Sequence, residues 1–118
     1  MPAMSDLAQR ILVAVPAARY VAVYRDGQLQ MSSREGLANP SSSESDKYEE
    51  LLVNPAVTTL LRQRGDIDCG GFEYVIVRYG NFYQFVEPVA GGHVSVALEP
   101  DARIDECVAR LRQVIGAA

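Results

Sequence analysis

The chain has a single histidine, His93, and this is the first residue to consider as a catalytic group. An imidazole can act as a general base when a serine or cysteine nucleophile lies beside it. His93 follows the pair Gly91–Gly92, and no serine or cysteine around it forms a nucleophile motif. A Ser–His or Cys–His pair brought together by the fold stays open, but the pattern favours a histidine in a surface turn. We therefore predict no catalytic residue.

Metal and phosphate sites require particular spacings, and the chain matches neither. Residues 66–71, DIDCGG, carry the acids and the glycine of a calcium loop at positions 1, 3 and 6, but position 12 is Val77 where a bidentate glutamate is needed. The pairs Gly70–Gly71 and Gly91–Gly92 lack the Lys-Ser/Thr ending of a phosphate-binding loop. The sequence thus predicts no metal, no cofactor and no nucleotide on this chain, and a glycine turn from a helix into a strand after residue 66.

Charge and composition narrow the class of partner. The chain has 118 residues and a net charge of −4, so it would repel the phosphate backbone of nucleic acids. The apolar run at residues 11–15 is too short to span a bilayer, and we expect neither a signal peptide nor membrane insertion. Cys69 and Cys107 form no Cys-x-x-Cys motif and are expected to be free thiols of a cytoplasmic protein. One domain over residues 1–118 is predicted.

The first half of the chain predicts a helix, a hairpin and a second helix. The first helix carries an apolar stripe and ends at Pro16; the stripe consists of Leu7, Ile11, Leu12 and Val15. Two strands follow in residues 20–33, joined by a type I′ turn at Asp26–Gly27. The second helix begins at residues 43–45, is interrupted at Asn54–Pro55 and ends at Gly65. Tyr48, Leu51 and Leu52 are expected to face inward, and the second piece contributes the apolar residues Val57, Leu60 and Leu61.

The second half predicts three strands and a closing helix. The strands are residues 72–79, 82–89 and 93–99, with a type II′ turn at Gly80–Asn81 between the first two. The last helix is capped by Asp101 and has an apolar stripe at helical spacing; its members are Ile104, Cys107, Val108, Leu111, Val114 and Ile115. The segments YVAVY and YVIV are apolar at every position, which requires cover on both faces. We therefore predict a five-stranded sheet between helices, an α/β sandwich.

This order of elements resembles the roadblock/LC7 family over nearly the whole chain. The residues that carry the resemblance are VAVYRDGQLQMSS, at 21–33, and YVIVRYGNFYQFVEPV, at 74–89. The resemblance implies a profilin-like fold, an antiparallel sheet in the order 2-1-5-4-3, with helix 2 on one face and helices 1 and 3 on the other. It also implies a non-catalytic adaptor or regulator that forms homodimers or heterodimers and binds a small Ras-like GTPase.

The strand over residues 72–79 would lie at a sheet edge in such a fold. It carries one acid and one base and lacks proline, so it has few of the features that protect an edge from pairing with another chain. We predict that two copies pair through this strand about a two-fold axis. The predicted dimer interface consists of Phe72, Tyr74, Val75, Ile76, Val77 and Tyr79, with Leu60 and Leu61 from the second helix.

A second hypothesis is a small-ligand sensor module. Related α/β sandwiches can open a cavity between sheet and helix, and Tyr74 or Tyr83 could line it. A core without a pocket would exclude this hypothesis. An enzyme is the third and weakest hypothesis, because nothing in the sequence pairs a nucleophile with a base.

Overall fold

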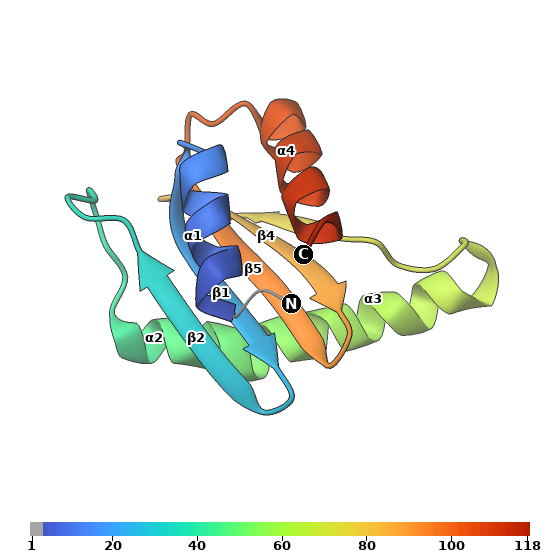
Figure 1. Cartoon of the computed structure of the whole chain (residues 1–118). Coiled ribbons are helices and arrows are strands. Elements are labelled where there is room, and N and C mark those ends of the chain that lie inside the picture. Colours follow the sequence, from blue (N-terminus) through green and yellow to red (C-terminus); the bar gives the residue numbers. More distant parts are fainter. Residues whose placement is uncertain (1–3) are drawn as a thin grey trace.

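The fold is built on an antiparallel sheet of five strands in the order β2-β1-β5-β4-β3. The computed structural model describes residues 4–118, whose course is drawn in Figure 1. The strands are β1 (Ala18–Arg25), β2 (Gln28–Ser33), β3 (Val75–Arg78), β4 (Tyr83–Val89) and β5 (Gly92–Leu98). The helices are α1 (Met4–Ala14), α2 (Ser43–Tyr48), α3 (Asn54–Asp68) and α4 (Ile104–Gly116), with the π-helical segment η1 (Glu49–Val53) between α2 and α3. The predicted strand order is confirmed.

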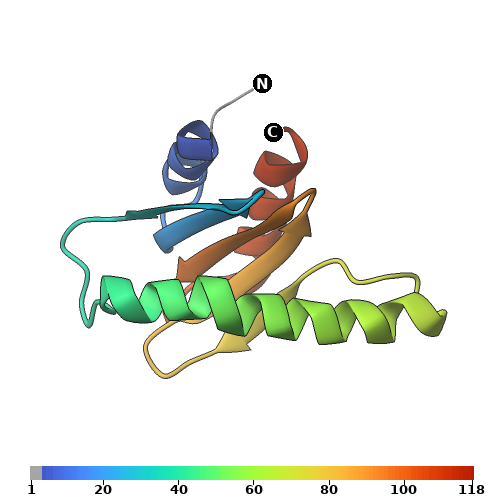
Figure 2. The same cartoon turned by 90° about the horizontal axis from the view of Figure 1, so that it is seen from below.

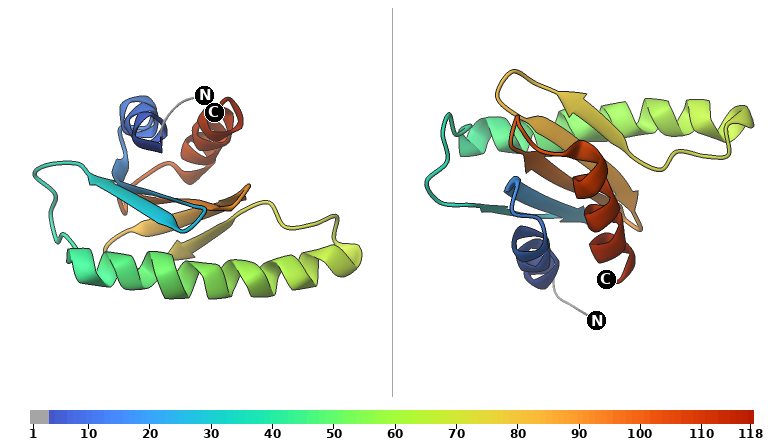
Figure 3. Two further views of the ribbon diagram at one scale, coloured as in Figure 1. Left: turned by 60° about the horizontal axis from the view of Figure 1, so that its bottom comes forward. Right: turned by 90° about the horizontal axis from the view of Figure 1, so that it is seen from above.

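Helices cover both faces of the sheet. The continuous run α2–η1–α3, called the long helix below, lies along one face, and α1 and α4 lie on the other (Figures 2 and 3). This cover explains why β1 is apolar at nearly every position, since its residues 18–23 are all buried. The predicted α/β sandwich is confirmed, with the second predicted helix alone on its face.

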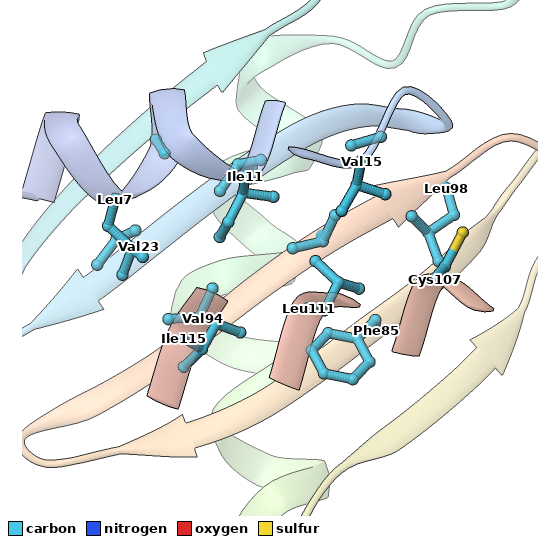
Figure 4. Packing of buried hydrophobic residues seen from close by; sticks show 14 residues of the cluster. Leu7, Ile11, Val15, Val23, Phe85, Val94, Leu98, Cys107, Leu111 and Ile115 are labelled. Atoms are coloured by element: carbon cyan, nitrogen blue, oxygen red, sulfur yellow. The ribbon is translucent and has the colours of Figure 1, made fainter. Parts of the chain in front are cut away.

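The main apolar core lies between the sheet and the pair α1 and α4. Leu7, Ile11 and Val15 come from the α1 end of the chain and meet buried valines of β1 and β5 (Figure 4). Leu111, which is fully buried, comes from α4 and packs near Phe85 of β4, and Cys107 of the same helix belongs to the same core. The apolar stripes predicted for the first and last helices are therefore confirmed as the faces that meet the sheet.

The two short turns show what backbone geometry each requires. Asp26 and Gly27 both have positive φ, 53° and 81°, which is the geometry of the predicted type I′ turn. Gly80 does not adopt a positive φ, so the predicted type II′ turn is wrong. Asp101 is not the cap of the last helix, because α4 begins at Ile104 and residues 99–102 form a separate turn closed by the bond from Ala102 N–H to the Glu99 carbonyl.

The long helix is unbroken at Asn54–Pro55, which contradicts the predicted interruption. Asn54 has helical φ and ψ of −62° and −44°, and its N–H donates to the carbonyl of Glu49, five residues earlier. Proline cannot donate to the residue four positions before it, and its ring collides with that carbonyl in a regular α-helix. The π-helical turn just before Pro55 shifts the bonding pattern from four to five residues, so the helix continues to Asp68.

Gly65 was predicted to end the helix, but the helix continues past it to Asp68. Gly65 instead lets the loop toward β3 pack against the helix. Cys69 N–H and Gly71 N–H both donate to the Gly65 carbonyl, at 3.1 Å each. A Cβ at position 65 would lie 2.8 Å from the carbonyl carbon of Gly71 and 3.0 Å from the backbone nitrogen of Phe72. The glycine therefore sets how closely the loop toward β3 approaches the helix.

We expect Gly65→Ala to lower the free energy of unfolding by about 1–3 kcal/mol, because the methyl group overpacks against backbone that cannot rotate away. Alanine is the better helix former by about 1 kcal/mol, so the sign of the change separates the two effects. The matched control is Gly116→Ala in α4, where an added Cβ meets nothing within 4 Å. Urea denaturation measures both variants, and a Gly65→Ala protein as stable as the wild type would contradict the close approach.

The edge strand β3 is shorter than predicted. It spans Val75–Arg78, four residues, whereas Phe72 and Tyr74 precede it and Tyr79 follows it. Its register with β4 places Val75 opposite Val86 and Ile76 opposite Phe85.

Candidate functional site

The outer face of the long helix carries large apolar side chains that no other part of residues 4–118 covers. Their exposed fractions range from 46% for Leu51 to 75% for Ile67, and they form what we call the outer stripe: Tyr48, Leu51, Leu52, Leu60 and Ile67. Tyr48, Leu51 and Leu52 were predicted to face inward, and that prediction is wrong. A row of large apolar side chains on one helix is typical of a surface that binds another protein.

The sheet edge lies beside this helix. Val77 of β3 stands opposite Gln84 in the register, and Gln84 faces the long helix, so Val75 and Val77 lie on the helix side of the sheet. The Tyr79 hydroxyl, just beyond β3, donates to Oε1 of Glu49 in η1 at 3.0 Å. Burial first, and then this bond to Glu49, raise the pKa of Tyr79 to about 12, so its hydroxyl keeps its proton as a donor.

The predicted interface residues divide between the two faces of the sheet. Ile76 packs against the main core. The Tyr74 ring contacts the Phe85 ring there in a tilted arrangement, with 5.6 Å between ring centroids, and the Arg112 guanidinium lies over the Tyr74 ring at 5.1 Å. Phe72 and Leu61 are half-buried. The structure brings the remaining four, Leu60, Val75, Val77 and Tyr79, to the side of the molecule that bears the long helix.

The inner face of the long helix is polar, which the sequence analysis missed. Glu50, Asn54 and Thr58 are spaced by four and face the sheet, and Glu50 is 0% exposed. Its Oε1 receives Asn54 Nδ2 at 2.9 Å and contacts His93 Nε2 at 2.8 Å. The spacing of four was the available signal, because it places three polar residues along one line of a helix.

The other oxygen of the same carboxylate is also bound. Glu50 Oε2 accepts from the Tyr20 hydroxyl at 3.2 Å and from Ser95 Oγ at 2.9 Å, and Gln84 Nε2 donates to Ser95 Oγ. Burial, followed by the charge of Glu50, raises the pKa of Tyr20 far above its ordinary value, so the phenol stays a donor. These contacts tie the long helix to β1, β4 and β5; we call Glu50, Asn54, His93, Ser95 and Tyr20 the buried polar cluster.

The cluster brings His93 and Ser95 together, as a Ser–His site would require, but directs their bonds elsewhere. His93 is 3% exposed, so the predicted surface position is wrong. The Ser95 hydroxyl donates to Glu50, and the imidazole contacts the opposite oxygen of the same carboxylate. A nucleophile needs its proton aimed at the base and a path for substrate. The geometry is that of a buried structural network.

Residues 66–71 form a helix exit, as expected. Asp68 pairs with Arg64 at 2.7 Å, and Gly70 and Gly71 turn the chain with φ of 78° and 93°. No group of three or more His, Cys, Asp or Glu within residues 4–118 is arranged to hold a metal ion. Cys69 is exposed and Cys107 buried, both as free thiols. None of the helices in the described part of the chain is long and apolar enough to cross a membrane.

Two adjoining cavities lie where the start of the long helix meets the sheet. The first, of about 290 Å³, is lined by Arg19 and Arg34, and the second, of about 450 Å³, by residues of α2, η1 and the loop after β3. Tyr20 and Phe82 border both. The predicted cavity-lining residues are not among them, because Tyr83 packs against the main core and Tyr74 also lies on that face of the sheet.

The chain matches no protein-family model and no curated protein by sequence. Its structure is similar to a roadblock/LC7 domain from Streptomyces avermitilis, with a TM-score of 0.75 and 15% identity over 98% of this chain and 94% of that one. It is similar to MglB in a tetrameric arrangement, with a TM-score of 0.71 and 13% identity over 96% and 82%. MglC from Myxococcus xanthus gives 0.64 and 15% over 96% and 93%. The fold, with its strand order and helix placement, is therefore the roadblock/LC7 fold.

Proposed function

We propose that the chain is a non-catalytic adaptor or regulator of roadblock type, that it forms a homodimer, and that the dimer binds a small Ras-like GTPase in the cytoplasm. One observation carries the proposal: the outer stripe and the free edge of β3 lie on the same side of the molecule. If two copies contacted each other on this side, the dimer would cover both the exposed apolar stripe and the unpaired edge of β3.

The arrangement of the stripe supports an antiparallel pairing of two long helices. Leu52 and Leu60 each lie four residues from the exposed Ala56, so a two-fold axis near Ala56 places the Leu52 of one copy opposite the Leu60 of the other. Such an axis makes the interface self-complementary and closes it.

Because β3 is short, we expect the outer stripe and β3 to contribute unequally to the binding free energy of the dimer. Four residues can contribute only a few main-chain hydrogen bonds, each with a net value of about 0.5–1.5 kcal/mol. A buried leucine contributes about 1.5–3 kcal/mol. The stripe therefore supplies most of the affinity, and β3 fixes the register.

The GTPase is proposed from the likeness to proteins of this fold. We expect a small Ras-like GTPase to bind the immobilised dimer with affinities that differ at least about tenfold between its GTP-analogue and GDP forms, because a regulator must distinguish the two states. Biolayer interferometry measures both.

The control is the chain alone with a fluorescent GTP analogue. With a net charge of −4 and no phosphate-binding loop, it should show no micromolar binding. Equal affinity for the two nucleotide states would contradict a regulatory role, and micromolar GTP binding by this chain would overturn the assignment of the nucleotide to the partner.

A further inference from the structure

The larger cavity at the start of the long helix has the composition of a cation-binding pocket. Its volume is about 450 Å³, and four aromatic side chains border it: Tyr20, Tyr48, Tyr79 and Phe82. The rings of Tyr79 and Phe82 meet at an angle of 57° with centroids 5.3 Å apart, so they form a corner with faces in two directions. Aromatic faces carry negative charge density and attract cations that have shed water.

The charges around the cavity have one sign. Asp46, Glu49 and Glu50 border it, and none of its lining residues within residues 4–118 is basic. Both carboxylate oxygens of Glu50 are already bonded within the buried polar cluster. Asp46 and Glu49 are only partly buried. The hydroxyls of Ser41 and Tyr79 hold these two carboxylates in place, at 2.6 Å and 3.0 Å.

The negative charge in the cavity lacks a counter-ion within it. Burial raises the pKa of Glu49, and the charges of Glu50 and Asp46 raise it further, against the bond from Tyr79, which lowers it. The guanidinium of Arg19 lies 5.9 Å from the Phe82 ring, but Arg19 lines the adjoining cavity and is paired with Glu99 at 2.8 Å. A ligand that brings a positive charge would be stabilised by both the carboxylates and the rings.

We propose that this cavity binds a small organic cation, an alkylammonium or guanidinium group carried on an apolar body. The rings would receive its methyl or methylene groups, and Glu49 and Asp46 would neutralise its charge. The inference concerns a ligand site at the joint of helix and sheet, and it does not depend on the GTPase. Tyr48 and Tyr79 border the cavity and also belong to the surface proposed for the dimer, so a ligand and the partner copy would contact the same two rings.

The test compares cations with uncharged molecules of the same shape. Choline is titrated against 3,3-dimethylbutan-1-ol, and butylguanidinium against butylurea, while NMR follows the backbone amides of Gly80 and Asn81 at the cavity rim. We expect at least one of the two cations to bind at least about tenfold more tightly than its neutral counterpart. The arm that binds identifies the ligand as an ammonium or a guanidinium.

Two variants and one control variant locate the site. Glu49→Gln removes one charge and should weaken binding of that cation at least about tenfold. Asp105→Asn, the same change of charge on exposed α4, should leave it unaltered. Phe82→Leu keeps apolar volume but removes a ring face, and should reduce the preference for cation over neutral molecule. Equal binding of both cations and their neutral counterparts, no shifts at about 10 mM, or unchanged affinity in Glu49→Gln would overturn the proposal.

Discussion

His93→Leu should lower the free energy of unfolding by about 3–5 kcal/mol, because it removes the imidazole from the buried Glu50 carboxylate and leaves Asn54 as the one remaining partner of Oε1. Glu50 is 0% exposed, so no water replaces the lost imidazole. This large loss of stability is expected because only one residue of the buried His93–Glu50 pair is removed. Leucine fills much of the same volume, which keeps a packing defect from accounting for the loss.

Adding Glu50→Gln to the His93→Leu protein tests whether the uncompensated charge of Glu50 causes this loss of stability. It removes the charge and keeps an amide that can bond to Tyr20, Ser95 and Asn54. The double variant should therefore be more stable than His93→Leu alone, although two residues are changed. Urea denaturation followed by circular dichroism measures all variants at one protein concentration, because dimer formation would otherwise shift the midpoints. A double variant less stable than His93→Leu would contradict the buried-charge explanation.

Leu60→Glu should weaken self-association about 100-fold to 10,000-fold. Leu60 is 66% exposed in the single chain, so the folded protomer tolerates the change. Across a two-fold axis the substitution occurs twice, and each buried leucine contributes about 1.5–3 kcal/mol, where 1.4 kcal/mol is a factor of ten. Sedimentation equilibrium over a range of concentrations measures the dissociation constant.

Val13→Glu is the matched control for this measurement. Val13 is 80% exposed on α1, which lies on the opposite face of the sheet from the long helix (Figure 2). It should leave the dissociation constant unchanged. If Leu60→Glu and Val13→Glu associate alike, the outer stripe is not the interface.

The sequence predicted the sheet and one of its two covering layers well, for a physical reason. α1, α4 and the strands between them bury their apolar residues within the same chain, so hydrophobic period and direction agree. Asp26–Gly27 specified its turn because both residues must adopt positive φ.

The long helix was predicted less well, because periodicity shows which residues need cover and does not show what covers them. Leu51 and Leu52 were assigned to the inner face, yet they point outward, and Glu50 anchors the inner face through its hydrogen bonds. Pro55 was interpreted as a break because a regular α-helix cannot accommodate it. The π-helical turn that absorbs it has no sequence pattern of its own.

Part of the surface proposed as the interface could be chosen from the sequence. Val77 and Leu60 were chosen because the edge strand has few protecting features and because the second helix carries apolar residues, and both lie on the side of the molecule that bears the long helix. His93 and Glu50 were not connected, because they lie 43 residues apart and meet only when β5 passes beneath the long helix.

The central claim is that two copies pair through β3, and an isotope-filtered NOE experiment on a mixture of labelled and unlabelled chains tests it most directly. Such spectra report only contacts between protomers. The account predicts cross-peaks between backbone protons of Val75–Arg78 in one protomer and those of the same strand in its partner. It also predicts a mass by light scattering of twice 12.9 kDa. A mass of 12.9 kDa at high concentration, or a dimer whose inter-protomer contacts exclude β3, would contradict it.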